Sequence, residues 1–376
     1  MNVLVAGDFA PMARLAEKVD SGQYQDIFCS EIQSIIKDSD VSFVNFECPI
    51  VENGYRAITK CGPHLKCSSN AAKAVKYAGF TGVTMANNHI LDYGSEGLDK
   101  SVECCKNEGL DVVGVGKNIT DANKVLYVEK NGEKLAVINC CEHEFSIATE
   151  TEGGANPLNP IRQYYTILEA KKNADYVLVI VHGGHEMFQL PSPRMQETYR
   201  FFIDSGADAI VNHHQHCFSG YEVYKSKPIF YGLGNFCFDE EGERNGIWNE
   251  GFMLKLNFSK GPIRFILYPY EQCNDTATVH LIADQKSFID RVRNLNAIIV
   301  NRKNLKEAIE KYYNSSSEYM TSVFQPYENR VLKKLYSMKL MPSLVTKKRF
   351  IQILNYINLE SHRDKMVFAL QRKFNK

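Results

Sequence analysis

The stretch ADAIVNHHQH, residues 207–216, joins a short apolar run to three histidines within four positions. The run ADAIV follows Gly206 and is typical of a buried strand. One histidine after such a strand can cap a turn or lie hydrogen-bonded in the core. Three of the ten histidines at one strand end indicate a functional site. The polar residues that follow the other predicted strands indicate what kind of site it is.

Outward from this stretch, the first two thirds of the chain alternates short apolar runs with helix-like segments, several of which end at glycine. The apolar runs are NVLVAG (2–7), VSFVNF (41–46), FTGVTMA (80–86), DVVGVG (111–116) and YVLVIV (176–181). Asn131–Gly132 is a two-residue hairpin signal, and the pattern after Gly220 is β-like as far as Tyr270. Strands alternating with helices and then with hairpins predict an α/β fold with two packed sheets and helices outside.

Charge is distributed unevenly along the chain. The 376 residues carry 44 Lys and Arg against 44 Asp and Glu, but from Lys286 onward the basic residues clearly outnumber the acidic ones. From about Ile282 the pattern is helical and basic. We therefore expect two domains, 1–280 and a basic helical region 281–376. Such asymmetry often accompanies a polyanion or membrane contact, but the alternative is a set of packed helices with solvated basic faces.

The eleven cysteines do not form a disulfide pattern, because they are odd in number, include adjacent pairs and contain no CxxC motif. A reduced, cytoplasmic compartment is therefore expected. The opening MNVLVAGD lacks the features of a signal peptide, and no apolar stretch reaches the roughly 20 residues that span a bilayer. We expect a soluble cytoplasmic protein, with peripheral attachment at the inner face of the membrane as the alternative.

Polar side chains follow most of the predicted strands. They are Asp8 after NVLVAG, Asn45 and Glu47 in and after VSFVNF, Asn88 and His89 after GVTMA, His182 after VLVIV, and His214 and His216 after ADAIV. Ligands of open α/β sheets bind at the carboxyl ends of the strands, so these residues are expected to converge. Each has an ordinary structural explanation alone, such as a turn or a capped helix. Together, they predict a site.

The residue types favour a metal centre. Two carboxylates, one amide and three imidazoles match the ligands of Mn²⁺, Fe or Zn²⁺. The predicted ligands are Asp8, Glu47, Asn88, His182, His214 and His216. This set exceeds the needs of one tetrahedral ion. With Glu47 bridging, it suits two divalent transition-metal ions roughly 3.5–4 Å apart.

Several motifs resemble the bacterial CapA family of capsule and poly-γ-glutamate synthesis proteins. They are GDF (7–9), NFECPI (45–50), ANNHILDYG (86–94), HGGHE (182–186), GADAIVNHHQH (206–216) and PIFYGLGNFCF (228–238). The resemblance covers roughly residues 1–240. That family is similar to calcineurin-like metallophosphoesterases, so it implies an αββα sandwich of the metallophosphoesterase type, here with a C-terminal helical extension.

The resemblance also implies roles for the matching residues. Asp8 resembles the first-strand ligand, Glu47 the bridging carboxylate, and Asn88 a metal-binding amide. His89 resembles the histidine that assists the leaving group, with Asp92 expected to orient it. The late histidine ligands are represented by His182, His214 and His216.

This chain departs at three places from the patterns of metallophosphoesterases and of the family that it resembles. The first strand reads DFA where Asp-x-His is usual, so one histidine ligand is missing. The bridging position holds Glu where Asp is usual. The segments HGGHE and NHHQH replace HWGxE and GxHPH.

Three further residues are predicted to contact substrate. They are Asn45, His64 in the loop GPHLK (62–66), and Glu186, which matches a family position. A plain surface loop is the alternative for His64. The cysteines Cys141 and Cys217 have no partner base in sequence, so nucleophilic catalysis by a thiol is not expected.

The sequence therefore predicts a metal-dependent phosphoesterase of capsule, surface polysaccharide or poly-γ-glutamate biosynthesis. Its substrate would be a phosphorylated glycan, polyol or polyglutamate-related compound. Two alternatives remain open: a non-hydrolytic accessory subunit of an assembly complex with a structural metal site, and an enzyme that acts on an amide bond. The basic tail is the candidate contact for a membrane or capsule-assembly partner, and nucleic acid is not expected because no binding module is recognised.

Overall fold

The computed structural model describes residues 1–327 and 329–374 and contains two compact units, Met1–Leu305 and Lys306–Lys376. The sequence predicts that the first domain ends at residue 280, whereas helix α8 (Gln285–Val300) belongs to the first unit. Its Phe288 and Val292 are buried in the core of that unit, and its Asn296 side chain accepts a hydrogen bond from the Tyr221 amide. The change of composition near Ile282 therefore marks the start of the helical region and not the end of the first core.

The first unit is built on two large sheets. In the first sheet the strand order is β16-β15-β14-β1-β2-β3-β4, and β13 also pairs with β1. The strands are β1 (Asn2–Ala10), β2 (Val41–Phe46), β3 (Gly82–Thr84), β4 (Asp111–Val113), β13 (Asn235–Phe238), β14 (Glu250–Asn257), β15 (Arg264–Gln272) and β16 (Val279–Leu281). Strands β1 to β4 are parallel and match the predicted apolar runs, and β14 to β16 are antiparallel.

The second sheet has the order β11-β12-β10-β9-β7-β6. Its strands are β6 (Leu126–Lys130), β7 (Glu133–Cys141), β9 (Tyr176–His182), β10 (Ala209–His213), β11 (Tyr221–Tyr224) and β12 (Lys227–Phe230). The predicted hairpin joins β6 to β7, with Asn131 and Gly132 both at positive φ, as a type I′ turn requires. A small ladder of β5 (Val115–Gly116) and β8 (Gly154–Ala155) lies outside both sheets.

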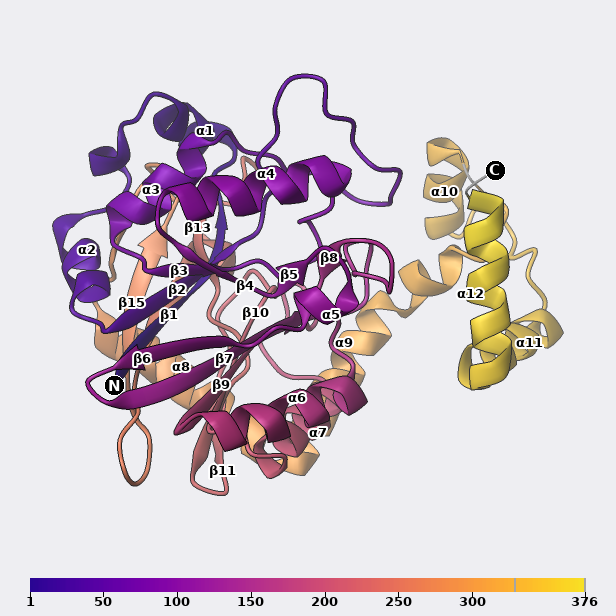
Figure 1. The fold of residues 1–376 in the computed structure, drawn as a ribbon. Coiled ribbons are helices and arrows are strands. Elements are labelled where there is room, and N and C mark those ends of the chain that lie inside the picture. Colours follow the sequence, from indigo (N-terminus) through magenta and orange to yellow (C-terminus); the bar gives the residue numbers. More distant parts are fainter. Residues whose placement is uncertain (328, 375–376) are drawn as a thin grey trace. The chain divides into compact units, whose positions relative to one another are not determined.

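Helices cover the outer face of each sheet, which gives four layers and confirms the predicted αββα sandwich (Figure 1). Successive residues of β1 show why: Val3 and Val5 face the second sheet, while Leu4 and Ala6 face the helices. The helices over the first sheet are α1 (Ala13–Asp20), α2 (Ser30–Lys37), α3 (Asn70–Ala78) and α4 (Gly94–Asn107). Those over the second sheet are α6 (Pro160–Asn173) and α7 (Pro193–Asp204).

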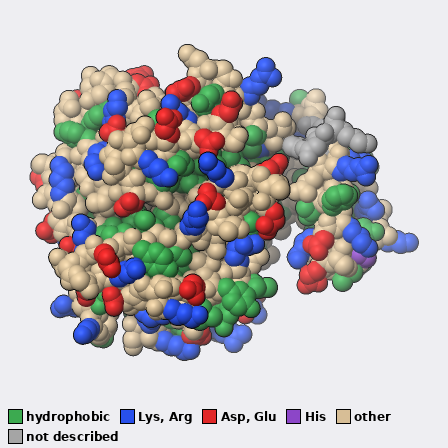
Figure 2. Space-filling model, in the orientation of Figure 1, with side chains coloured by type: hydrophobic (Ala, Val, Ile, Leu, Met, Phe, Trp, Pro, Cys, Tyr) green, Lys and Arg blue, Asp and Glu red, His purple; other side chains and the backbone are tan. Residues whose placement is uncertain are grey.

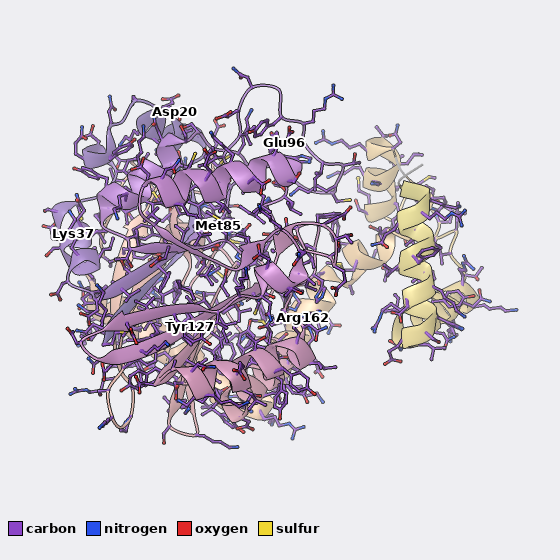
Figure 3. All side chains as sticks on the ribbon, in the orientation of Figure 1. Asp20, Lys37, Met85, Glu96, Tyr127 and Arg162 are labelled. Atoms are coloured by element: carbon purple, nitrogen blue, oxygen red, sulfur yellow. The ribbon has the colours of Figure 1, made fainter. Side chains whose placement is uncertain are left out.

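Side-chain exposure follows these layers. Met85 is buried between the first sheet and its helices, whereas Glu96 on α4 is exposed (Figure 3). The short elements are η1 (Tyr24–Asp26), α5 (Ile119–Ala122) and η2 (Ile247–Asn249). All eleven cysteines are free thiols.

Strand β1 makes an unusually close backbone approach beside the site. A Cβ atom on Gly7 would lie 1.7 Å from the carbonyl oxygen of Gly234, so this position admits glycine alone without movement of the backbone. Gly234 itself has a φ of +82°, in the left-handed region that favours glycine. The two glycines bring β1 and β13 together, with Asp8 opposite Asn235.

The second unit is helical. Helix α9 (Arg302–Ser322) crosses the division between the units and is followed by α10 (Arg330–Ser337), α11 (Lys347–Asn358) and α12 (Glu360–Phe374). Lys and Arg side chains are plainly visible on this unit, close to exposed hydrophobic ones (Figure 2). Within residues 1–327 and 329–374, none of the helices has both the length and the apolar character needed to cross a bilayer.

Candidate metal centre

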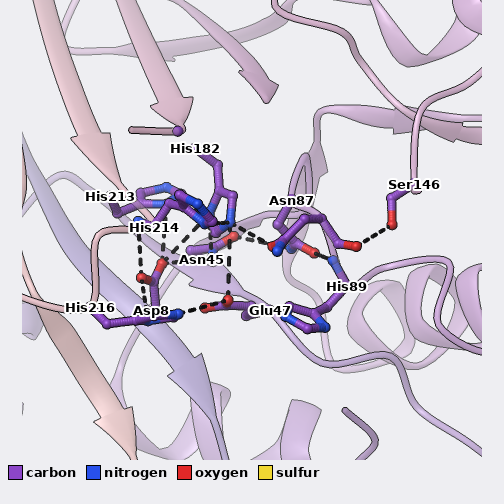
Figure 4. A network of polar contacts seen from close by, with 12 residues as sticks. Asp8, Asn45, Glu47, Asn87, His89, Ser146, His182, His213, His214 and His216 are labelled. Atoms are coloured by element: carbon purple, nitrogen blue, oxygen red, sulfur yellow. Dashed lines mark hydrogen bonds and ion pairs between the residues drawn. The ribbon is translucent and has the colours of Figure 1, made fainter. Parts of the chain in front are cut away.

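The carboxyl ends of the parallel strands of both sheets meet at one place in the first unit. Asp8 of β1 lies opposite Asn45 of β2, and His182 of β9 lies opposite His213 of β10. Asp8 and His213 come from different sheets, and Asp8 Oδ1 is 3.1 Å from His213 Nδ1. The polar side chains from these strand ends point toward one another (Figure 4).

Four ligand atoms form a first group. His182 Nε2 lies 2.9 Å from Asn88 Oδ1, 2.9 Å from His214 Nδ1 and 4.0 Å from Glu47 Oε1. The side chains supply imidazole, amide and carboxylate donors, which together suit a divalent transition metal.

A second group shares Glu47 with the first. His216 Nε2 is 3.9 Å from Glu47 Oε1, and His216 Nδ1 is 3.6 Å from Asp8 Oδ2. His216 Nδ1 also lies 2.9 Å from Asn235 Oδ1 of β13. A hydrogen bond from Nδ1–H to this amide leaves Nε2 as the free ligand nitrogen, which is how metal-binding histidines are commonly oriented.

Glu47 provides the test of whether these residues fit a cation. The side chain is fully buried, and both carboxylate oxygens lack a hydrogen-bond partner. An unpaired buried carboxylate is costly, so it calls for a positive charge that protein atoms do not supply here. The donor set around Glu47 therefore fits a bound divalent cation.

Two of the imidazoles, those of His182 and His214, are kept in the form that binds metal. Burial, reinforced by the neighbouring imidazoles, lowers the pKa of His214 to about 3 and lowers that of His182 well below 6.5. Neutral imidazole is the ligand form. Burial and the nearby Asp8 raise the pKa of Glu47 well above 4.5. Burial also acts to raise the pKa of Asp8, but His213 and His216 outweigh it and lower the value.

His89 and Asp92 lie beside the ligand groups. His89 Nδ1 is 2.7 Å from Asp92 Oδ2, and the His89 amide donates to Asn87 Oδ1 at 3.1 Å. Ser146 Oγ donates to the Asn88 carbonyl at 2.7 Å, which fixes the turn that carries both Asn88 and His89 (Figure 4). The contact predicted between Asp92 and His89 is thus present.

The residues predicted to contact substrate occupy three different environments. Asn45 is fully buried and donates to Asp8 Oδ1 at 2.8 Å, so its contact is with a candidate ligand. His64 is half-buried, with Nε2 2.7 Å from the Ile58 carbonyl oxygen within its own loop. Glu186 is exposed and contributes to the raised pKa of Glu47.

Sequence reasoning missed three residues of this region. His213 contacts both Asp8 and His182, and with them forms a further set of close ligand atoms. His213 stands in NHHQH at the end of a predicted strand, but only His214 and His216 are predicted there as ligands. Asn235 orients His216, and Lys60 lies 3.2 Å from His89 Nδ1. Asn235 lies within the motif PIFYGLGNFCF (228–238), but no role is predicted for it, and Lys60 stands in a segment without a local signal.

Among solved structures, two of the matches are distant. A hypothetical protein from Thermus thermophilus matches at a TM-score of 0.46 with 17% identity, covering 72% of this chain and 99% of that one. A putative 5'-nucleotidase from Staphylococcus aureus matches at 0.43 with 15% identity, covering 78% of this chain and 58% of that one.

Comparisons with curated sequences give much closer matches. The capsule biosynthesis protein CapA of Bacillus anthracis is 34% identical over 64% of this chain and 60% of its own length. The PGA biosynthesis protein CapA of Bacillus subtilis (strain 168) is 35% identical, with 69% of each chain covered. The chain thus spans about two thirds or less of these relatives. The family of bacterial capsule synthesis proteins PGA_cap matches residues 2–240, which contain every candidate ligand, and this protein belongs to that family.

Proposed function

We propose that the protein is a metal-dependent phosphoesterase that binds two divalent transition-metal ions, Mn, Fe or Zn. One ion would be held by Asn88, His182, His214 and Glu47. The other would be held by Asp8, His216 and the shared Glu47. The observation that carries the proposal is the pair of buried oxygens of Glu47 that have no hydrogen-bond partner, because Glu47 Oε1 lies 4.0 Å from His182 Nε2 and 3.9 Å from His216 Nε2.

Divalent ions in such a centre polarise phosphoryl oxygens and lower the pKa of water toward neutrality. The chain's own residues supply the remaining chemistry. Asp8 and Glu47 balance positive charge, and Asn45 holds Asp8 in place through its hydrogen bond. Fixed, preorganised groups of this kind stabilise charge in the transition state without reorganisation.

His89 is the proposed acid for the leaving group. Its Nδ1 is engaged by Asp92, so Nε2 is the nitrogen available to a substrate oxygen. Protonation of a leaving alkoxide by a positioned histidine contributes roughly 10²–10⁴-fold to such reactions. Glu186, exposed beside the centre, and His64 are proposed as substrate contacts.

The names of the relatives point to the biological context. They are described as capsule or PGA biosynthesis proteins, and a Mycobacterium tuberculosis relative, 25% identical, is described as a probable polyglutamine synthesis accessory protein. We propose that this chain acts in the same kind of pathway, on a phosphorylated glycan, polyol or polyglutamate-related compound, in the cytoplasm.

The basic second unit is the proposed contact with a membrane or assembly partner. Leu354 of α11 and Phe368 of α12 are 56% and 66% exposed, and both helices carry Lys and Arg. Apolar and basic side chains on one helix favour the surface of an anionic bilayer. The proposal treats this unit as separate from the catalytic domain.

The test is hydrolysis by the full chain after metal removal and reconstitution with Mn²⁺ or Zn²⁺. p-Nitrophenyl phosphate, bis-p-nitrophenyl phosphate and γ-glutamyl-p-nitroanilide distinguish monoesterase, diesterase and amidase activity. Glu47→Gln is the matched inactive variant. Phosphoester hydrolysis that is lost in this variant supports the proposal. A metal-loaded wild type no faster than Glu47→Gln on every substrate would favour a structural metal site in an accessory subunit.

A further inference from the structure

The two ligand groups that share Glu47 differ in their donor atoms. The first group offers two imidazole nitrogens, one amide oxygen and one carboxylate, from His182, His214, Asn88 and Glu47. The second group offers a single imidazole nitrogen and two carboxylates, from His216, Asp8 and Glu47. The first group therefore has one more nitrogen donor and the larger set of ligands.

The first group is also the more compact of the two. His182 Nε2 lies 2.9 Å from Asn88 Oδ1 and 2.9 Å from His214 Nδ1. Two ligand atoms that are each about 2.1 Å from one zinc ion lie roughly 3–3.5 Å apart, so these three atoms need little movement. In the second group, His216 Nε2 is 3.9 Å from Glu47 Oε1 (Figure 4). A cation in the second group must therefore move the side chains further.

Asp8 is a weaker ligand than Glu47 because its oxygens already accept hydrogen bonds. Asp8 Oδ1 accepts from the Asn45 side chain at 2.8 Å, and Asp8 Oδ2 accepts from the His214 backbone amide at 3.0 Å. These bonds use electron pairs that a cation would otherwise take. Both oxygens of Glu47 have no hydrogen-bond partner. The second group thus contains one free carboxylate and one that is already engaged.

Strand β1 adds no further donor to the second group. After Asp8 it continues with Phe9 and Ala10, whose side chains have no ligand atom. His213 is close to Asp8, but it approaches Oδ1 and forms a separate set with Asp8 and His182 that does not include Glu47. Three protein ligands are fewer than the six oxygen ligands that a hard cation such as Mg²⁺ takes. Water or substrate oxygens are needed to complete the second group.

We propose that the two cation sites differ in class: the first group holds a resident Zn²⁺ or Fe²⁺, and the second group takes an exchangeable Mn²⁺ that substrate phosphate helps to hold. This proposal rests on the proposed function of the site. Imidazole nitrogens favour Zn²⁺ and Fe²⁺, whereas carboxylates and water suit Mn²⁺ and Mg²⁺. Hard cations are commonly held by one or two carboxylates together with substrate phosphate oxygens.

Titration of the metal-free full chain with Zn²⁺, in competition with a chromogenic chelator, measures the first difference. Two binding steps are expected, with the first at least about 10²-fold tighter, because loss of even an outer partner of a metal ligand costs roughly 10–100-fold in affinity. The chain with one Zn²⁺ should then bind one Mn²⁺, counted from the loss of the electron paramagnetic resonance signal of free Mn²⁺. Two Zn²⁺ ions of equal affinity, or no Mn²⁺ bound to the one-zinc chain, would overturn the proposal.

Inorganic phosphate tests the role given to the substrate. Because coupling between two ligands is typically worth about 5–150-fold in affinity, phosphate should tighten Mn²⁺ binding to the one-zinc chain by at least about 5-fold. Potassium chloride of equal ionic strength is the control and should leave Mn²⁺ binding unchanged. An equal effect of both salts contradicts the part of the proposal that concerns phosphate. The readout is bound metal, so no enzymatic activity is required.

Three variants assign the binding steps to the groups. Asp8→Asn should leave the first Zn²⁺ step unchanged and abolish Mn²⁺ binding, whereas His214→Ala should weaken the first Zn²⁺ step. Asp99→Asn, on the exposed surface of α4, is the matched control and should behave as wild type. Equal weakening of the first step by Asp8→Asn and His214→Ala would contradict the assignment. If either variant does not fold, the two wild-type titrations decide.

The outcomes separate this proposal from the proposed function. Unequal binding by a chain that hydrolyses no phosphoester supports the two classes of site and refutes the phosphoesterase. Phosphoester hydrolysis by a chain with two equal Zn²⁺ sites supports the phosphoesterase and refutes the two classes. A chain that binds no stoichiometric metal contradicts both proposals.

Discussion

Glu47→Gln should stabilise the metal-free protein while removing its response to metal. The carboxyl is fully buried without a partner, and burial together with Asp8 raises its pKa well above the ordinary 4.5. In the folded protein it keeps its proton at a pH where the unfolded chain has lost it. Unfolding therefore releases a proton from this group, and the contribution of Glu47 to wild-type stability falls as pH rises from 4.5 toward the raised pKa.

The size of the effect follows from this linkage. Each pH unit between 4.5 and the raised pKa costs the wild type up to about 1.4 kcal/mol, so the stability advantage of the variant should grow by up to this amount per unit across that window. Near pH 4.5 the difference should vanish. Excess Mn²⁺ or Zn²⁺ reverses the order, because ligand at 100-fold its dissociation constant stabilises the wild type by about 2.7 kcal/mol, and the variant lacks the shared ligand.

Urea unfolding between pH 4.5 and 7, in chelator and then in excess metal, measures both effects. Glu52→Gln is the control, because its side chain is 54% exposed and its loss should change stability by less than about 0.5 kcal/mol. A Glu47→Gln protein with the same pH profile as wild type would show that Glu47 is not a destabilised carboxyl. Unchanged metal stoichiometry in the variant would show that it is not a ligand.

Three further predictions concern the ligands, the acid and the tail. His216→Ala should lose metal together with activity, whereas His89→Ala should keep its metal and turn over roughly 10²–10⁴-fold more slowly. Elemental analysis and kinetics distinguish the two variants. Equal metal loss in both would contradict the role of His89 as the acid. Burial lowers the pKa of His214 to about 3, so this group takes up a proton on unfolding below pH 6.5. Its contribution to metal-free stability should fall toward acid by up to about 1.4 kcal/mol per pH unit, and the difference between wild type and His214→Asn in urea titrations measures that contribution. A chain ending at 305 should stay folded and active on small esters but lose binding to anionic vesicles in sedimentation assays, while one ending at 284 should be insoluble because it exposes the surface that α8 covers. Vesicle binding by the chain ending at 305, equal to that of the full chain, would contradict the role given to the second unit.

The fold was largely predictable because its strands are short apolar runs with polar ends. Strands β1, β2, β9 and β10 lie where the runs predicted them, and the carboxyl ends of both sheets bring Asp8 and His182 together. The domain boundary was less predictable. Basic composition marks the exposed face of α8, whereas its buried face decides to which unit it belongs.

The site was predictable where ligands follow strands and unpredictable where the backbone turns. His214 and His216 are predicted ligands that follow a strand, but their φ values are +97° and +55°, and β10 ends at His213. The backbone turns in the left-handed region after β10, so the His214 and His216 side chains lie at the candidate metal centre together with His213, the last residue of that strand. Lys60 reaches His89 through a loop folded back on Asp92, a tertiary contact that no local pattern records.

The close approach of Gly7 and Gly234 has an evolutionary consequence. Neither residue has a side chain that could do chemistry, yet a methyl group at Gly7 would push β1 and β13 apart. Asp8 and Asn235 would separate with them, and Asn235 orients His216. Selection against substitutions at these two glycines is therefore expected to be as strict as selection against substitutions at the ligands. A homologue without the metal centre could accept a larger residue at either position. A larger residue at the position of Gly7 or Gly234 can therefore serve as a marker of relatives that lack the site.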